Sequence, residues 1–112
     1  MYKSLTNIIV RKEESCRMKE RHPDRLPIIV EPRNGNISKI DKNKYMVPKD
    51  LLFGQLTYVI RKRIRLSKDQ ALFIFTNGKL ITASSVISDV YNDNVDEDGF
   101  LYIVYDFENA FG

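Results

Sequence analysis

Side chains that commonly carry catalysis are sparse in this sequence. His22 is the one histidine and Cys16 the one cysteine, and Pro23 follows His22 directly. Acyl-transfer chemistry needs a nucleophile held against a base, and no Ser or Cys stands in a pattern that pairs it with His22. We interpret His22 as a surface or packing residue and Cys16 as at most a mildly reactive thiol. The sequence therefore predicts no catalytic residue and no enzyme.

A second candidate for chemistry is the acidic run near the C-terminus. Asp93, Asp96, Glu97 and Asp98 carry oxygen ligands of the kind that calcium binds. They lack the regular spacing and the closing glutamate of an EF-hand loop. We interpret the run as a solvated acidic turn, and we expect neither a metal nor a cofactor.

The helices that must position such residues can be placed from periodicity and capping. A helix is predicted over residues 8–21, because this segment contains no Gly or Pro and ends just before Pro23. The clearest helix follows Asp50, the expected N-cap, with apolar residues at helical spacing from Leu52 to Ile64. A short helix over residues 86–91 is expected behind Ser84 or Ser85.

Strands are predicted from β-branched runs between turn residues, at 26–30, 44–47, 72–75, 79–81 and 100–105. Asn77-Gly78 predicts a type I′ hairpin turn. The resulting order is helix, then β-β-α-β-β-α-β. This order predicts an α+β fold, a ubiquitin-like β-grasp with a mixed four-stranded sheet and a crossing helix. We expect one domain over residues 1–112, comprising an N-terminal helical extension (1–22) and the β-grasp (23–112).

Charge is divided unevenly along the chain. Residues 1–65 carry 16 basic and 7 acidic side chains, whereas residues 66–112 carry 2 basic and 8 acidic ones, for a net charge of +3. A basic half predicts an acidic partner, which nucleic acid, anionic lipid or an acidic peptide would satisfy. The single cysteine favours a reducing, intracellular setting.

Several ordered blocks resemble one known family. They are His22–Glu31, Ile40–Pro48, Gly54–Gln55 with Tyr58–Ile64, Asp96–Tyr102 and the tail Glu108–Gly112. These blocks are similar to the autophagy ubiquitin-like modifiers typified by GABARAP and microtubule-associated protein light chain 3, over nearly the whole chain from Glu14. The chain resembles a divergent member, because Met18, Met46 and Leu56 replace the commoner Ile, Leu and aromatic residue.

The resemblance implies a chemistry performed on the tail of the protein. In the family, activating-type and conjugating-type enzymes join the C-terminal glycine, here Gly112, to phosphatidylethanolamine, and a cysteine protease processes or deconjugates it. Glycine suits this role, because a carbonyl without a neighbouring Cβ can be approached closely. The implied location is the cytoplasm, and the autophagosomal membrane after lipidation.

The resemblance also implies a groove for receptors with acidic aromatic-x-x-aliphatic segments, which add as a strand beside residues 44–47. The implied aromatic pocket consists of Glu14, Met18, Pro27, Ile29, Lys44, Met46 and Phe100. The implied aliphatic pocket consists of Tyr45, Val47, Pro48, Leu51, Leu56 and Val59. The implied electrostatic contacts with the segment's acidic residues come from Arg25, Lys42, Lys44 and Arg63.

A function of a different class is also compatible with the sequence. The chain could be an unconjugated basic module that binds RNA or anionic lipid through its first 65 residues. The two hypotheses differ on the tail, since only the first needs Gly112, and the first expects no nucleic acid partner.

Overall fold

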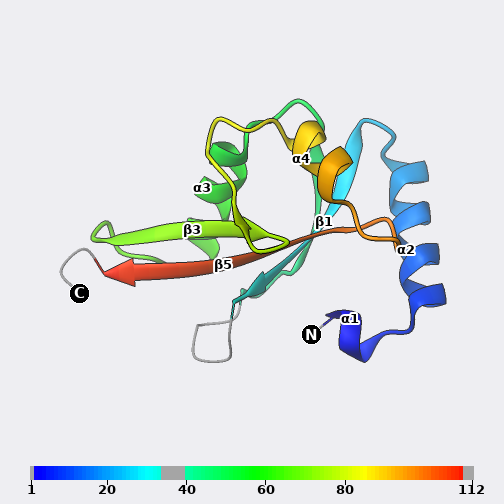
Figure 1. The fold of residues 1–112 in the computed structure, drawn as a ribbon, viewed down its shortest axis with the longest axis horizontal. Helices are drawn as coiled ribbons and strands as arrows, with labels where there is room; N and C mark the ends of the chain where they lie inside the picture. Colours follow the sequence, from blue (N-terminus) through cyan, green and yellow to red (C-terminus); the bar gives the residue numbers. More distant parts are fainter. Residues whose placement is uncertain (1, 34–39, 110–112) are drawn as a thin grey trace.

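The computed structural model describes residues 2–33 and 40–109 (Figure 1). The helices are α1 (Tyr2–Leu5), α2 (Ile8–Arg21), α3 (Phe53–Arg63) and α4 (Ile87–Asn94). The strands are β1 (Arg25–Pro32), β2 (Lys44–Pro48), β3 (Gln70–Thr76), β4 (Lys79–Leu80) and β5 (Leu101–Asn109). The predicted ubiquitin-like fold with an N-terminal helical extension is confirmed. Among the described residues the sheet holds five strands and not the predicted four, because the strand expected at 79–81 pairs with β3 as the two-residue β4.

The strands lie in the order β2-β1-β5-β3-β4, which places β2 at one edge of the sheet. The central strands β1 and β5 run parallel, with Ile28 opposite Leu101. The other neighbouring pairs are antiparallel, and Ile28 lies opposite Tyr45 in the β1–β2 pair. The sheet is therefore mixed, as predicted.

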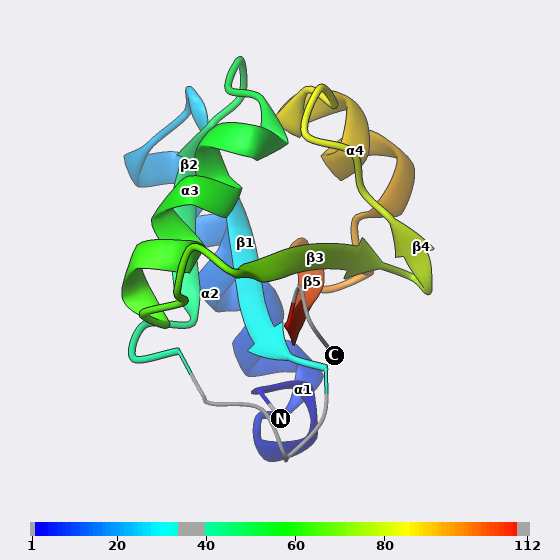
Figure 2. The same ribbon diagram turned by 90° about the vertical axis from the view of Figure 1, so that its left-hand side faces the viewer.

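The two faces of the sheet carry separate apolar clusters. Leu26, Ile28 and Val30 of β1 pack with α3, α4 and the other strands in the main core. Ile29 points to the opposite face, because side chains alternate along a strand, and it joins a smaller cluster with Tyr2 and Phe100. In Figure 1, α3 and α4 lie above β3 and β5, and α2 stands beside β1; Figure 2 shows α2 behind β1. The N-terminal extension thus covers the face that α3 leaves open.

Two local predictions are confirmed in detail. Helix α2 spans the predicted residues, and Asn7 caps it by accepting hydrogen bonds from the backbone N–H groups of Ile9 and Val10. Asn77 and Gly78 have φ values of 49° and 77°, and a type I′ turn requires positive φ at both of these positions.

The predicted helix caps at Asp50 and at Ser84 or Ser85 are wrong. Helix α3 begins after Leu52 and α4 begins after Val86, and neither N-cap uses a side chain. The reason is tertiary: Leu52 and Val86 form an isolated antiparallel bridge, and the Phe53 N–H donates to the Ser85 carbonyl at 2.8 Å. These backbone bonds keep both segments extended past the polar residues that would otherwise start a helix. Among the described residues, no helix is long and apolar enough to cross a membrane.

Candidate functional site

A hollow of about 160 Å³ lies between the edge strand β2 and helix α3. It is lined by Tyr45, Met46, Val47, Pro48, Leu51, Gln55, Leu56 and Val59. The six residues expected for the aliphatic pocket are thus brought together, and Gln55 and Met46 join them. Gln55 could have been found from its spacing, because Leu51, Gln55 and Val59 follow one another at intervals of four.

The lining of this hollow divides into a buried floor and an open rim. Tyr45, Val47 and Leu56 are buried, whereas Leu51 is half-buried and Val59 is 40% exposed. The floor therefore belongs to the main core, and the rim offers apolar surface to a ligand.

Tyr45 gives the floor a polar atom with an unusual environment. Its hydroxyl is buried and has no hydrogen-bond partner among the described residues. Burial raises the pKa of Tyr45, so the hydroxyl stays protonated at neutral pH. A buried hydroxyl without a hydrogen-bond partner lowers the stability of the folded protein, and it can form a hydrogen bond with a ligand that reaches it.

The residues expected for the aromatic pocket come from α2, β1, β2 and the start of β5. Pro27, Ile29 and Phe100 are fully buried, and Glu14, Met18, Lys44 and Met46 are half-buried around them. Pro27 lies opposite Met46 in the β1–β2 pair. The structure brings this set to the face of the sheet that α1 and α2 cover.

Tyr2 of α1 lies among these residues, although no pattern in the sequence singles it out. Its ring meets the Phe100 ring edge-on, with 5.7 Å between centroids, and the Lys44 ammonium lies 4.5 Å from the Tyr2 centroid. The Tyr2 hydroxyl donates a hydrogen bond to Glu14. Tyr2 is only 9% exposed. No periodicity could have indicated it, because α1 has four residues and is too short to show a pattern.

Glu14 links Tyr2 to β2 through a polar contact. The Lys44 ammonium lies 2.5 Å from a Glu14 carboxylate oxygen. Burial opposes ionisation of Glu14, but the hydrogen bonds from Lys44 and Tyr2 prevail and lower its pKa. Burial raises the pKa of Tyr2, and the bond to Glu14 raises it further. At neutral pH the contact thus joins a carboxylate, an ammonium and a neutral phenol.

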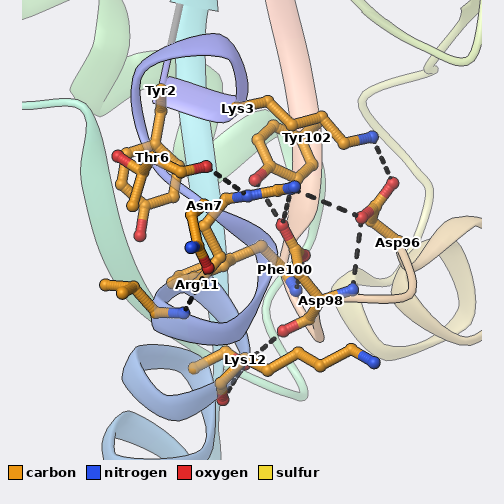
Figure 3. Close-up of polar contacts among 12 residues, drawn as sticks. Tyr2, Lys3, Thr6, Asn7, Arg11, Lys12, Asp96, Asp98, Phe100 and Tyr102 are labelled. Carbon is orange, nitrogen blue, oxygen red and sulfur yellow. Dashed lines mark hydrogen bonds and ion pairs between the residues drawn. The ribbon is translucent and has the colours of Figure 1, made fainter.

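A buried ion pair fastens α2 to the loop before β5 (Figure 3). The Arg11 guanidinium lies 2.7 Å from an oxygen of Asp98, whose side chain is fully buried. The Tyr102 hydroxyl donates to the same oxygen at 2.5 Å, and Lys3 pairs with Asp96 at 2.5 Å. The interpretation of a solvated acidic turn is therefore wrong for Asp98, because α2 covers the loop and Arg11 compensates the buried carboxylate.

Gly99 allows the close approach of α2 to this loop. Its φ is +91°, and a Cβ placed there would lie 2.5 Å from Oγ of Ser15. The Ser15 hydroxyl donates to the Asp98 carbonyl. The next residue is Phe100, so this tight contact also fixes the floor of the aromatic pocket.

The expected cations surround the two pockets. Arg63 pairs with Asp41 at 3.3 Å, and an Arg25 nitrogen lies 3.4 Å from the Met46 carbonyl oxygen. The Lys42 ammonium lies 5.1 Å from the centroid of the Tyr45 ring. Arg25 and Lys42 therefore place positive charge beside β2, whereas the charge of Arg63 is shared with Asp41.

Comparison with known proteins decides the family. Residues 10–112 match the family model described as "Autophagy protein Atg8 ubiquitin like". The chain belongs to the Atg8 family. It is therefore an autophagy protein with a ubiquitin-like fold.

Two curated Atg8 relatives illustrate the similarity. Autophagy-related protein 8e of Arabidopsis thaliana is 52% identical over 103 residues, which cover 91% of this chain and 84% of the relative. Autophagy-related protein 8 of Schizosaccharomyces pombe is 50% identical over 103 residues, with coverage of 91% and 85%.

Solved Atg8 structures agree with the fold. The crystal structure of Trypanosoma brucei ATG8 has a TM-score of 0.91 and 43% identity, covering 99% of this chain and 97% of that one. Plasmodium falciparum Atg8, solved in complex with a Plasmodium falciparum Atg3 peptide, has a TM-score of 0.85 and 25% identity, with coverage of 95% and 94%.

Gly112, His22 and Cys16 are the other residues that the sequence singles out in this Atg8-family chain. Gly112 is outside the described residues. His22 is exposed at the C-terminal end of α2, and Cys16 is exposed on the same helix. Within residues 2–33 and 40–109, no three His, Cys, Asp or Glu side chains gather as metal ligands.

Proposed function

We propose that this Atg8-family chain is a ubiquitin-like modifier, joined through Gly112 to phosphatidylethanolamine, that recruits receptors to autophagosomal membranes. It is a substrate of activating-type and conjugating-type enzymes and of a processing cysteine protease, and it is not itself an enzyme. It is cytoplasmic until lipidation attaches it to the membrane. The observation that carries the proposal is the apolar hollow beside the edge strand β2.

An edge strand next to an apolar hollow suits a ligand that binds as an added strand. β2 is hydrogen-bonded to β1 on one side and forms the border of the sheet on the other. A peptide strand along β2 would gain main-chain hydrogen bonds, and its alternate side chains would meet pockets on the protein. An aliphatic side chain fits between Leu51 and Val59, above the buried floor of the hollow.

The cations along β2 favour an acidic peptide. Arg25, Lys42 and Arg63 border the groove, so acidic residues next to the peptide's aromatic anchor would meet positive charge. Exposed pairs of this kind contribute roughly 0.2–1 kcal/mol each. Charge therefore orients and steers the ligand, and apolar burial supplies most of the affinity. The peptide complex of the Plasmodium relative supports extending peptide binding to this chain.

Support for the lipidated tail comes from the family match, which extends to residue 112. The test uses the purified chain with activating and conjugating enzymes of the Atg8 system, ATP and phosphatidylethanolamine vesicles. Wild type should give a lipidated species, and Gly112→Ala should give none. Equal conjugation of both proteins, or of neither, would contradict the proposal.

Peptide binding needs a separate test. An acidic peptide of the aromatic-x-x-aliphatic pattern should shift the NMR signals of residues 44–48, and a peptide with both anchors replaced by alanine should not. Shifts confined to β3 and β4, at the other edge of the sheet, would contradict the assignment of the groove.

A further inference from the structure

The aromatic pocket contains a side chain of the protein itself. We propose that Tyr2 is an internal occupant of this pocket, and that the aromatic anchor of a peptide must displace it. The inference rests on the proposed peptide-binding function and adds a regulatory step at the same site.

The contacts of Tyr2 resemble those that an aromatic anchor would make. Tyr2 forms one apolar cluster with the buried Ile29 and Phe100, and Met18 packs against this cluster. The Lys44 ammonium lies over the ring, and Glu14 accepts the hydroxyl hydrogen bond. Tyr2 therefore already uses the apolar, cationic and acidic groups that were expected to receive the ligand.

The low exposure of Tyr2 indicates that its side chain covers the aromatic pocket and does not merely lie at the edge of an open pocket. The residue is 9% exposed although it belongs to the first turn of the described chain. Leu5, three residues later on the same short helix, is 86% exposed. Helix α1 thus buries one aromatic side chain in the proposed pocket and leaves its other large apolar residue in solvent.

The attachment of α1 allows this occupant to leave without unfolding α2. The Asn7 side chain caps α2 independently of α1. Arg11 holds the carbonyl of Thr6 at 3.0 Å, so the segment is fixed immediately after α1. Before that point, the contacts of α1 include those of Tyr2, the partly exposed pair of Lys3 with Asp96, and the Lys3 ammonium 5.1 Å from the centroid of the Tyr102 ring. Movement of α1 about this fixed point would release Tyr2 while α2 stays docked.

The chain contains no tryptophan, which permits a direct test. A peptide whose aromatic anchor is its single Trp would report, by its fluorescence, its own entry into the pocket. Titrations compare wild type with Tyr2→Ala, Tyr2→Phe and the control Leu5→Ala. Tyr2→Ala should lower Kd about three- to tenfold, because apparent affinity is weakened by the small fraction of wild-type molecules in which Tyr2 has left the pocket.

Tyr2→Phe should give an intermediate Kd, since it keeps the ring but loses the hydrogen bond to Glu14. Leu5→Ala should bind as wild type does. Equal or weaker binding by Tyr2→Ala would overturn the inference. Tyr2 would then have no effect on peptide affinity, or would contact the bound peptide and stabilise it. If no variant binds the peptide, the proposed function itself fails.

A second measurement does not depend on a substitution. In the free protein, NMR should show nuclear Overhauser effects between the rings of Tyr2 and Phe100, whose centroids lie 5.7 Å apart. Saturation with the peptide should abolish them. Their persistence in the saturated complex would overturn the proposal even if the affinities changed.

Discussion

The two proposed pockets beside β2 are built from opposite faces of the same strand and differ in what fills them. The aliphatic pocket is an open hollow of about 160 Å³ with a solvent-exposed rim. The aromatic pocket is covered by Tyr2 and crossed by the contact between Glu14 and Lys44. A ligand side chain that enters the hollow gains its apolar burial directly, at about 25 cal/mol per Å². A ligand side chain that enters the aromatic pocket replaces the buried Tyr2 ring with its own, so the net gain in buried apolar surface is smaller.

The largest effect is expected from loosening the support of the covered pocket. Asp98→Asn removes the charge that compensates Arg11 in a buried pair. Breaking such a pair should lower the free energy of unfolding by about 3 kcal/mol, measured by urea denaturation. Glu97→Gln, an exposed change in the same loop, is the matched control and should have little effect. Equal stability of the two variants would show that the ion pair does not hold the extension.

A smaller effect is expected at the open pocket. Leu51→Ala removes apolar rim surface and should weaken binding of an aromatic-x-x-aliphatic peptide about tenfold, measured by calorimetry. Leu80→Ala is the control, because Leu80 is also exposed but lies in β4 at the opposite edge of the sheet. If both variants bind equally well, the hollow is not the aliphatic pocket.

Acid should open the covered pocket and leave the hollow unchanged. The pKa of Glu14 is lowered in the folded protein. Its contribution to stability is therefore complete above the pKa that Glu14 has in the unfolded chain, and it is lost as the pH falls through the pKa that Glu14 has in the folded protein. The Tyr2–Phe100 nuclear Overhauser effects of the free protein should therefore persist at neutral pH. They should weaken below about pH 4, under the ordinary pKa of glutamate.

Glu14→Gln serves as the control for this titration, because Lys44 and Tyr2 remain while the titrating group is gone. It should remove the acid transition from the ring signals. An unchanged transition in Glu14→Gln would assign the titration to another carboxylate, such as Asp96, whose pKa is also lowered.

The smallest effect concerns the hydroxyl in the floor of the open pocket. Tyr45→Phe removes a buried group without a hydrogen-bond partner among the described residues, so stability should stay level or rise by up to about 1 kcal/mol. Tyr58→Phe on the exposed surface of α3 should change nothing. A loss of more than about 1 kcal/mol for Tyr45→Phe would mean that the hydroxyl is bonded in solution.

Local signals in the sequence predicted the open pocket better than the covered one. The alternation at Lys44–Val47 and the helical spacing through Val59 placed β2 and α3 correctly, because each pattern arises within one element. Asp50 failed as a cap because the backbone contacts between residues 52–53 and 85–86, far along the chain, moved the helix start. Such competition between local capping and distant pairing cannot be read from one segment.

The covered pocket depends on contacts between the two ends of the chain. Asp98 is buried beneath α2, where Arg11 compensates its charge, and Tyr2 is buried where its ring meets Phe100. Neither pairing leaves a periodic pattern. An acidic residue in a polar run is more often exposed, and that general tendency led to the wrong interpretation of Asp98.

The parallel pairing of β1 with β5 has a consequence for synthesis of the chain. β1 is made early, yet the strand that pairs with it at the centre of the sheet is the last one in the described sequence. Contacts between distant segments form slowly, because a long loop must close before they contribute. On the ribosome, the central pair of strands therefore cannot form until β5 has been synthesised. Chaperones that shield apolar segments would have the longest time to bind at residues 26–30.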